Sequence, residues 1–415
     1  MGLKPGYKQT DVGVIPEDWV VSSLHSLVKL GPKNGYSGQS DRDPRGTATL
    51  SLPATSSGRI VLNGETIKYL LKPIPKDSPL FLEVGDVLVQ RSNTAELVGT
   101  TAVYQGPEAT FIYPDLMMRL RFKRPVEGEW FWRYANSRMG RTFFRSIAAG
   151  STGTMPKISG DKLREMLVPV PPAPELEAIA ETLSDSDALI EFLEQLITKK
   201  RQLKQGSMQE LLTGKKRLPG FEKKTGYKKS DVGVIPVDWD LYTIDSLASI
   251  TTGSRNTQDS VDEGLYPFFV RSQTVERINS YSFEGEAVLT AGDGVGTGKV
   301  FHYINGRFDA HQRVYRISNF AENLNGYFFY LYFSNHFYSR IMQMTAKSSV
   351  DSVRREMIAK MLIPLPPNKD EQTAIAAVLS DMDAEIATLE TKLTKARELK
   401  TGMMQELLTG RIRLI

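Results

Sequence analysis

The sequence predicts an α+β protein with a pseudo-two-fold internal repeat: two globular mixed β/α domains separated by two long antiparallel helices that form a coiled coil. Three observations support this prediction. The motif Gly-Val-Ile-Pro-x-Asp-Trp at Gly13–Trp19 returns at Gly233–Trp239, an offset of 220 residues (233 − 13). The motif Gln-Glu-Leu-Leu-Thr-Gly at Gln209–Gly214 returns at Gln405–Gly410, an offset of 196 (405 − 209), and each copy closes a segment with heptad spacing. Solenoid repeats measure roughly 20–50 residues, so this period indicates a duplicated domain with its connector.

The two helices are expected at about residues 173–213 and 369–409. Their apolar residues alternate steps of three and four, as in a coiled-coil seam. We assign helix packing to Leu183, Ile190, Leu193, Ile197, Leu379, Ile386, Leu389 and Leu393, and extend the seam to Leu203 and Leu399. Each helix is acidic at its start and basic at its end, so antiparallel packing places opposite charges together. The alternative is two solvated amphipathic helices on separate domains.

The four expected segments are residues 1–168 (first globular domain), 169–217 (first spacer helix), 218–363 (second globular domain) and 364–415 (second spacer helix). Short strands and glycine turns dominate the globular segments, which predicts mixed β domains. The aromatic runs Trp130–Trp132 and Tyr327–Tyr330 are expected on helices that contribute to the core. Val98–Tyr104 aligns with Val295–Phe301, an offset of 197 (295 − 98).

The composition argues against several classes of function. The chain has no cysteine, so disulfides, thiol nucleophiles and cysteine-bound zinc are excluded. Its four histidines lack metal-ligand spacing, and Asp293 and Val300 break the phosphate-loop pattern of Gly292–Lys299. We therefore predict no catalytic residue and no metal site. The start has no signal core and no apolar run reaches bilayer length, so we expect a cytoplasmic protein without a membrane partner.

Loops rich in basic and amide side chains are the candidates for DNA contact. Such side chains hydrogen-bond phosphates and base edges, whereas the alternative reading of each loop is a solvated surface. The candidate DNA-binding residues are Lys33, Asn34, Tyr36, Arg91, Ser92, Asn93, Thr154, Lys157, Arg255, Asn256, Thr257, Arg271, Lys299, Lys347 and Arg354. The run His311–Arg313 is interpreted instead as buried structure.

Over its whole length the chain resembles the specificity subunits of type I restriction–modification systems. The repeated entrance motif and the repeated helix ends carry the resemblance, and further matching segments are Leu167–Pro172, Leu362–Pro367, Gly292–His302 and Phe308–Tyr315.

The resemblance implies a non-catalytic subunit that binds an asymmetric, bipartite site in double-stranded DNA through two target-recognition domains. It also implies that the spacer helices dock two methyltransferase subunits, and that restriction subunits join the larger complex. S-adenosylmethionine, ATP and magnesium would be bound by those partners, with no cofactor in this chain. Two alternatives stay open: a specificity subunit of a related bifunctional restriction–methyltransferase system, and a coiled-coil adaptor that does not bind DNA.

Overall fold

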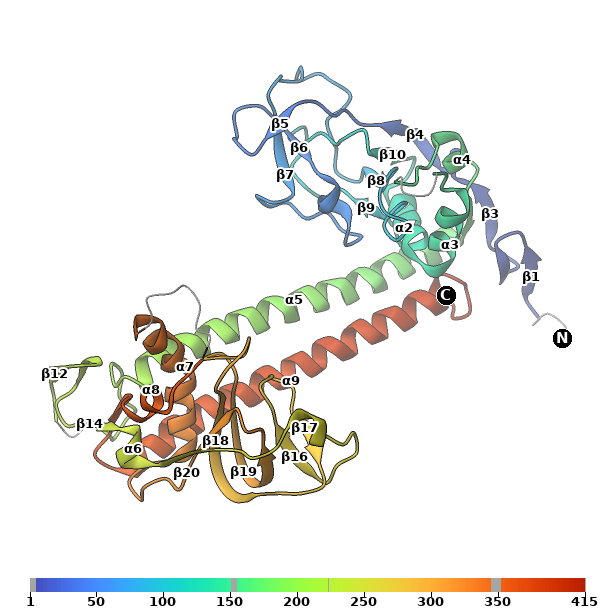
Figure 1. The fold of residues 1–415 in the computed structure, drawn as a ribbon. Helices are drawn as coiled ribbons and strands as arrows, with labels where there is room; N and C mark the ends of the chain where they lie inside the picture. Colours follow the sequence, from blue (N-terminus) through green and yellow to red (C-terminus); the bar gives the residue numbers. More distant parts are fainter. Residues whose placement is uncertain (1–4, 151–154, 223, 345–351, 415) are drawn as a thin grey trace. The chain divides into compact units, whose positions relative to one another are not determined.

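The computed structural model describes residues 5–150, 155–222, 224–344 and 352–414 (Figure 1). They form two compact units: unit 1 is Met1–Phe192 with Lys392–Ile415, and unit 2 is Leu193–Thr391. Each unit combines one β-rich region with parts of two continuous helices, α5 (Ala173–Leu211) and α9 (Lys369–Leu407). Each helix has 39 residues, or about 58 Å of rise. The predicted mixed fold with two long helices is confirmed.

Unit 1 contains a four-stranded sheet of order β4-β10-β8-β9, a three-stranded sheet of order β5-β7-β6, and the strand pairs β1-β2 and β11-β3. Short helices flank these sheets. The strands are β1 (Tyr7–Thr10), β2 (Gly13–Pro16), β3 (Val20–Ser23), β4 (Val28–Asn34), β5 (Ser40–Asp41), β6 (Thr47–Leu50), β7 (Ile67–Leu70), β8 (Val87–Gln90), β9 (Thr101–Val103), β10 (Met117–Phe122) and β11 (Leu167–Val170). The helices are α1 (Leu24–Leu27), η1 (Leu52–Thr55), α2 (Pro125–Asn136), α3 (Arg138–Ile147) and α4 (Gly160–Arg164).

Unit 2 contains a six-stranded sheet of order β15-β20-β18-β19-β16-β17 and the strand pairs β12-β13 and β14-β21. The strands are β12 (Tyr227–Ser230), β13 (Gly233–Pro236), β14 (Asp240–Thr243), β15 (Ser249–Thr252), β16 (Tyr266–Phe269), β17 (Glu276–Ile278), β18 (Phe283–Ala291), β19 (Phe301–Ala310), β20 (Val314–Ser318) and β21 (Leu362–Leu365). The helices are α6 (Ile244–Leu247), η2 (Thr257–Asp259), α7 (Gly326–Met344) and α8 (Arg355–Ala359).

The entrance motif forms the same structure in both units. It supplies the second strand of a hairpin, β2 or β13, followed by a tryptophan, Trp19 or Trp239, that is fully buried. Gly13 and Gly233 begin these strands with φ of 103° and 110°, in the left-handed region where glycine carries no side-chain clash. The motif therefore repeats because each unit repeats one hairpin and one buried indole.

An arginine that follows each long helix ties that helix end to the entrance motif. In unit 2, Arg217 donates to Glu371 at 2.5 Å and to Asp238 at 2.8 Å, and its side chain is only 5% exposed. In unit 1, the equivalent Arg413 donates at 2.7 Å to Glu175 and at 2.7 Å to Asp18. We call each set an anchor cluster. In unit 1 this cluster brings the two described ends of the chain together.

The helices also pair by charge within each unit. In unit 2, Lys200 lies 2.7 Å from Glu385, and Lys204 bonds to Asp383. In unit 1, Asp187 is the shared acceptor for Lys400, for Arg133 of α2 and for Arg59. Basic residues late in one helix thus meet acidic residues early in the other, as expected for antiparallel packing.

The assigned seam residues differ in burial. Leu183, Ile190, Leu193, Ile197, Leu379, Ile386 and Leu389 are buried, and Leu393 is half-buried. The extension of the seam to Leu203 and Leu399 is wrong, since these side chains are 50% and 63% exposed. The predicted seam advances by two consecutive steps of three residues from Ile197 to Leu203, and likewise from Leu393 to Leu399. Every such step falls about 60° short of a full turn, which rotates the side chain off the seam.

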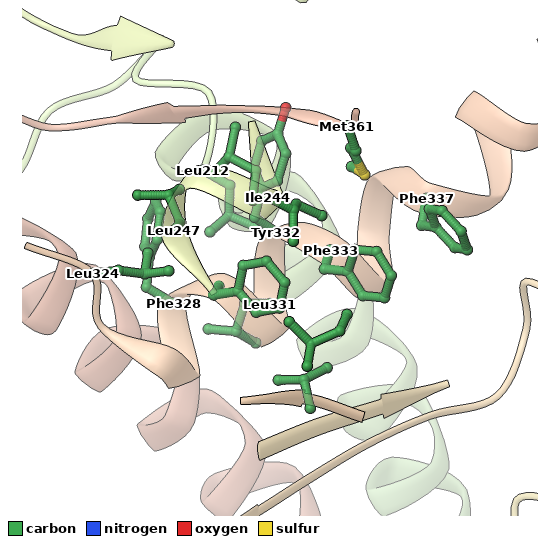
Figure 2. Packing of buried hydrophobic residues seen from close by; sticks show 14 of the residues in the cluster. Leu212, Ile244, Leu247, Leu324, Phe328, Leu331, Tyr332, Phe333, Phe337 and Met361 are labelled. Atoms are coloured by element: carbon green, nitrogen blue, oxygen red, sulfur yellow. The ribbon is translucent and has the colours of Figure 1, made fainter. Parts of the chain in front are cut away.

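Aromatic residues of α7 form the core of unit 2 (Figure 2). Phe333 is fully buried, and its ring lies 4.5 Å from that of Phe337 and 5.5 Å from that of Phe329. These residues are spaced by four, so they share one helix face, which packs with Ile244 and Leu247 of α6 in the same cluster. The prediction that Tyr327–Tyr330 lies on a core helix is confirmed, and Trp130 is likewise buried on α2.

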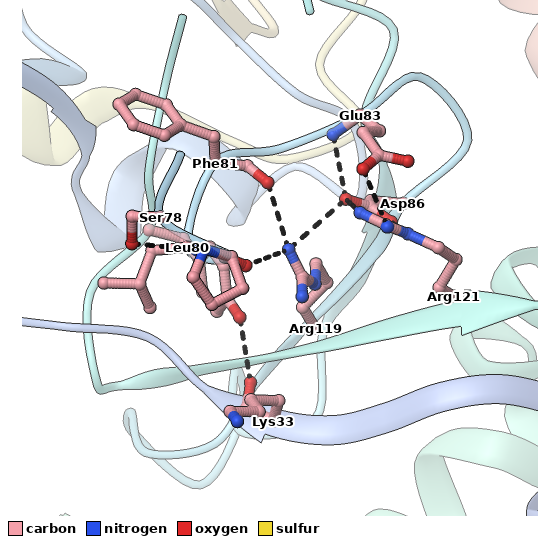
Figure 3. A network of polar contacts seen from close by, with 10 residues as sticks. Lys33, Ser78, Leu80, Phe81, Glu83, Asp86, Arg119 and Arg121 are labelled. Atoms are coloured by element: carbon pink, nitrogen blue, oxygen red, sulfur yellow. Dashed lines mark hydrogen bonds and ion pairs between the residues drawn. The ribbon is translucent and has the colours of Figure 1, made fainter. Parts of the chain in front are cut away.

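A buried ion network holds the main sheet of unit 1 (Figure 3). Asp86 has a fully buried carboxylate that accepts from Arg121 at 2.7 and 2.9 Å and from the backbone N–H of Glu83 at 2.9 Å. Arg119, 2% exposed, donates to the carbonyls of Pro79 and Phe81 and lies 3.8 Å from Asp86. Together they join β10 to the segment before β8.

Candidate nucleic-acid interface

Several loops of unit 2 meet at one edge of the six-stranded sheet. The N–H of Arg255 donates to the carbonyl of Ala310 at 3.2 Å, which joins the segment after β15 to the end of β19. The N–H of Gly292 donates to the carbonyl of Arg313 at 2.7 Å, and the carbonyl of Gly292 accepts from Val353 at 2.7 Å. Residues 253–259, 292–299, 310–314 and 352–354 therefore form one surface, which we call the unit 2 loop edge.

Positive charge exceeds negative charge at the centre of this edge. Arg271 lies 2.9 Å from Asp293, and Arg313 lies 3.7 Å from the same carboxylate. Their side chains are 45% and 65% exposed, so both guanidinium groups can reach solvent or a ligand. Two cations share one anion here, which favours an anionic partner.

A neutral histidine shapes the turn that carries Arg313. Burial is the main cause that lowers the pKa of His311 below its ordinary value, and the nearby positive charge of Arg271 lowers it further. Its ring nitrogen Nδ1 accepts from the backbone N–H of Arg313 at 3.0 Å. His311 is buried as expected, but Gln312 and Arg313 are exposed, so the interpretation of the run His311–Arg313 as buried structure is wrong for these two residues.

The other candidates of unit 2 lie on or beside this edge. Arg255 donates to the buried Asp309 at 3.0 Å and stays 41% exposed. Asn256 and Thr257 are exposed at the start of η2, where Asn256 accepts from Gln312 at 2.7 Å. Lys299 is exposed, with its ammonium 5.6 Å from the ring centroid of Tyr338, and Arg354 is exposed directly before α8. Lys347 lies outside the described residues.

Unit 1 builds an equivalent edge from its own loops. The N–H of Tyr36 donates to the carbonyl of Tyr113 at 2.9 Å, and that of Arg91 donates to the carbonyl of Leu116 at 2.8 Å. The carbonyl of Arg91 accepts from Ile158 at 2.9 Å. This arrangement brings together the candidates Lys33, Asn34, Tyr36, Arg91 and Lys157, all exposed except the half-buried Arg91.

Two candidates of unit 1 are buried and one lies outside the described residues. Ser92 is 1% exposed, and Asn93 is 8% exposed with its amide donating to Gln90 at 2.6 Å. Gln90 in turn donates to the hydroxyl of Thr55 at 2.9 Å. The hydrophilic run suggested a surface loop, but these side chains support the loop from inside. Thr154 is the candidate outside the described residues.

The alignment of Val98–Tyr104 with Val295–Phe301 is wrong. Val98 is 1% exposed, whereas Val295 is 98% exposed. The structural equivalent of Gly99 is Gly298: their φ values are 79° and 67°, and an added Cβ would lie 2.2 Å from Phe144 of α3 or 2.4 Å from Ile341 of α7. Gly298 lies six residues after Gly292, whereas Gly99 lies eight residues after Arg91 (298 − 292 = 6; 99 − 91 = 8). The loop of unit 2 is therefore two residues shorter, and matching the two sequences does not show where these two residues are missing.

Among residues 5–150, 155–222, 224–344 and 352–414, no three His, Cys, Asp or Glu side chains gather closely enough to hold a metal ion. Within the same ranges, no helix combines the length and apolar character needed to cross a membrane.

Comparison with known proteins decides the family. Residues 236–398 match the family model described as the type I restriction modification DNA specificity domain. A protein from Methanocaldococcus jannaschii, provisionally named the MjaX specificity subunit of a type I restriction enzyme, is 25% identical, and the match covers 98% of this chain and 97% of that protein. The chain belongs to the type I restriction–modification specificity subunits. It is a DNA specificity subunit, a non-catalytic part of its enzyme.

Two further relatives agree with this assignment. The MjaVIII specificity subunit of M. jannaschii is 26% identical, over 73% of this chain and 75% of its own length. The crystal structure of the type I system S subunit from M. genitalium has the same fold, with a TM-score of 0.61 at 15% identity over 98% of this chain and 99% of that one. The specificity-subunit fold is thus present over nearly the whole chain.

Proposed function

We propose that this specificity subunit binds an asymmetric, two-part site in double-stranded DNA, with one half-site read by each unit. Residues 1–168 and 218–363 are the target-recognition domains, and residues 169–217 and 364–415 are the spacer regions. One observation carries the proposal: the two loop edges share a backbone arrangement but differ in side chains. Arg91 is replaced by Gly292, and Leu116 by Arg313. Because base edges are read by side chains, such a pair of edges would select different half-sites.

The proposed DNA-contacting set keeps the candidates from both loop edges and adds Arg313. Lysine and arginine would contact phosphates, and amide, hydroxyl and guanidinium groups would read base edges. The exposed cations around Asp293 support the phosphate contacts.

The Arg313→Ala variant tests this function. We expect weaker DNA binding by the complete complex, and a slope of log affinity against log salt that is smaller by about 0.9, the value for one lost phosphate contact. The matched control is Lys229→Ala, which removes an exposed lysine of β12. Equal salt slopes for wild type and Arg313→Ala would count against a phosphate contact at this residue. Mapping methylated adenines in DNA modified by the complex would test the two-part site itself.

We further propose that the spacer helices dock two methyltransferase subunits, one on each of two equivalent patches. The patch of unit 2 pairs the exposed Leu203 with the exposed helical Gly206, and the patch of unit 1 pairs Leu399 with Gly402. The offset is 196 in both cases (399 − 203 and 402 − 206). Residues three apart share a helix face. Glycine inside an exposed helix costs about 0.5–1 kcal/mol, and a partner helix approaching closely would explain its presence twice.

Restriction subunits would join this assembly in the cytoplasm. S-adenosylmethionine would be held by the methyltransferase subunits, and ATP and magnesium by the partner subunits that use them.

Changes at these patches should separate folding from assembly. We expect Gly206→Ala to raise the free energy of unfolding of the isolated chain by about 0.5–1 kcal/mol, because nothing lies within 4 Å of the added Cβ, while weakening methyltransferase binding. The variants Leu203→Asp and Leu399→Asp should each lose one methyltransferase subunit from the complex. The double variant should lose both subunits. Native mass spectrometry of the assembled complex reads the subunit count. Full occupancy in the double aspartate variant would contradict docking at these patches.

A further inference from the structure

The tip of the loop between β18 and β19 exposes an aliphatic side chain almost completely. Val295 is 98% exposed, and Leu265, at 70%, follows it among the large hydrophobic side chains of the described residues. Single exposed hydrophobic residues are common on protein surfaces. Val295 is unusual because it contributes no packing to its own unit and stands on a loop edge rich in cations.

The backbone beneath Val295 is firmly held. The N–H and the hydroxyl of Thr297 donate to the carbonyl of Gly294 at 3.1 and 2.6 Å. At Gly296, an added Cβ would lie 2.4 Å from the carbonyl oxygen of Arg271, so this loop lies directly against the segment after β16. A side chain on such a pinned turn loses little conformational entropy when it binds a ligand.

The surroundings of Val295 indicate the chemistry of its partner. The side chains of Arg271 and Arg313 flank the loop through Asp293, and Lys299 follows in the same loop. An apolar protein partner would leave these cations facing an apolar surface, at the desolvation cost of unpaired charge. A DNA groove presents phosphates to the cations and base edges to the tip, so it satisfies both kinds of group.

We propose that Val295 selects a thymine in the half-site read by unit 2, by packing its methyl groups against the C5 methyl group of that base in the major groove. This rests on the proposed DNA binding by unit 2. Valine has no hydrogen-bonding group, and the thymine methyl is the apolar feature that the major groove offers. Side chains that wedge between stacked bases are usually longer or cyclic, such as Phe, Leu, Met or Pro, so contact with a base edge suits valine better.

The test uses the complex with its methyltransferase subunits and duplexes carrying the mapped site. Each thymine of the half-site read by unit 2 is replaced in turn by deoxyuridine, which lacks only the methyl group. We expect wild type to lose roughly fourfold in affinity at one position, the effect of one buried methyl group. Val295→Ala should bind the thymine duplex more weakly by a similar factor and no longer distinguish the two bases at that position. Val261→Ala, a change at another exposed valine of unit 2, should behave as wild type.

Three results would overturn the inference while leaving DNA recognition intact: selective binding with no uracil effect at any position, unchanged discrimination in Val295→Ala, or a half-site without thymine on either strand. Failure of the complex to bind the mapped site selectively at all would instead overturn the proposed function, and the inference with it.

Discussion

Replacing Arg217 with alanine is expected to lower the free energy of unfolding of unit 2 by about 3–5 kcal/mol, because removing one partner of a buried ion pair leaves unpaired charge. Glu371 and Asp238 would both lose their cation, and their side chains are 1% and 6% exposed. Hydrogen exchange of the β12, β13 and β14 peptides measures this unit separately from unit 1. Peptides from the end of α5 should also exchange faster, because the anchor cluster holds this end against the hairpin.

The stability lost in Arg217→Ala should depend on pH, and the pKa of Glu371 gives the direction. Burial raises the pKa of Glu371 above its ordinary value, while Arg217 opposes this rise. Without the arginine the folded-state pKa rises further above the unfolded value. The protonated carboxyl is then favoured in the folded state, so stability is retained at acidic pH and lost as pH rises through the folded pKa. The deficit of Arg217→Ala relative to wild type should therefore be larger at neutral pH than at acidic pH.

The matched change in unit 1, Arg413→Ala, should cost less, about 1–3 kcal/mol. The side chain of Arg413 is 23% exposed and its partner Asp18 is 51% exposed, so water can replace part of the lost interaction. A deficit below about 1 kcal/mol for Arg217→Ala, the range of exposed ion pairs, would show that the anchor cluster does not stabilise its unit.

The second large effect is expected at Asp86, where alanine should destabilise the main sheet of unit 1 by about 3–5 kcal/mol. The change removes the acid that faces two arginines, of which Arg119 is 2% exposed and cannot turn to solvent without opening the sheet. Hydrogen exchange of β8 and β10 measures the outcome. A protected sheet in Asp86→Ala would mean that the carbonyls of Pro79 and Phe81 alone satisfy Arg119.

Glu83→Ala provides the control for Asp86→Ala. Glu83 also contacts Arg121, at 2.8 Å, but its side chain is 58% exposed. Exposed ion pairs contribute about 0–1 kcal/mol, so this variant should remain close to wild type. The contrast between the two acids isolates the effect of burial, because both bind the same arginine.

The sequence by itself determined the repeated parts of this protein. Heptad spacing and terminal glycines predicted α5 and α9, because a helix surface is generated by local periodicity. The entrance motif predicted that the two units begin in an equivalent way, and the structure shows that this beginning is a hairpin followed by a buried tryptophan. The repeat also extended to Arg217 and Arg413, each three residues after its motif glycine, but nothing in the sequence identified their acidic partners, which lie more than 150 residues away in Glu371 and Glu175 (371 − 217 = 154; 413 − 175 = 238).

Only the tertiary structure decided which polar and apolar side chains reach the surface. Ser92 and Asn93 resembled surface residues, yet they lie beneath their own loop. Leu203 and Leu399 resembled core residues, yet two short steps of the helix turn them outward. Arg313 and Val295 became candidates only when the loops that flank them met at one edge. Exposure depends on contacts between segments distant in the chain, and local residue type or spacing does not encode those contacts.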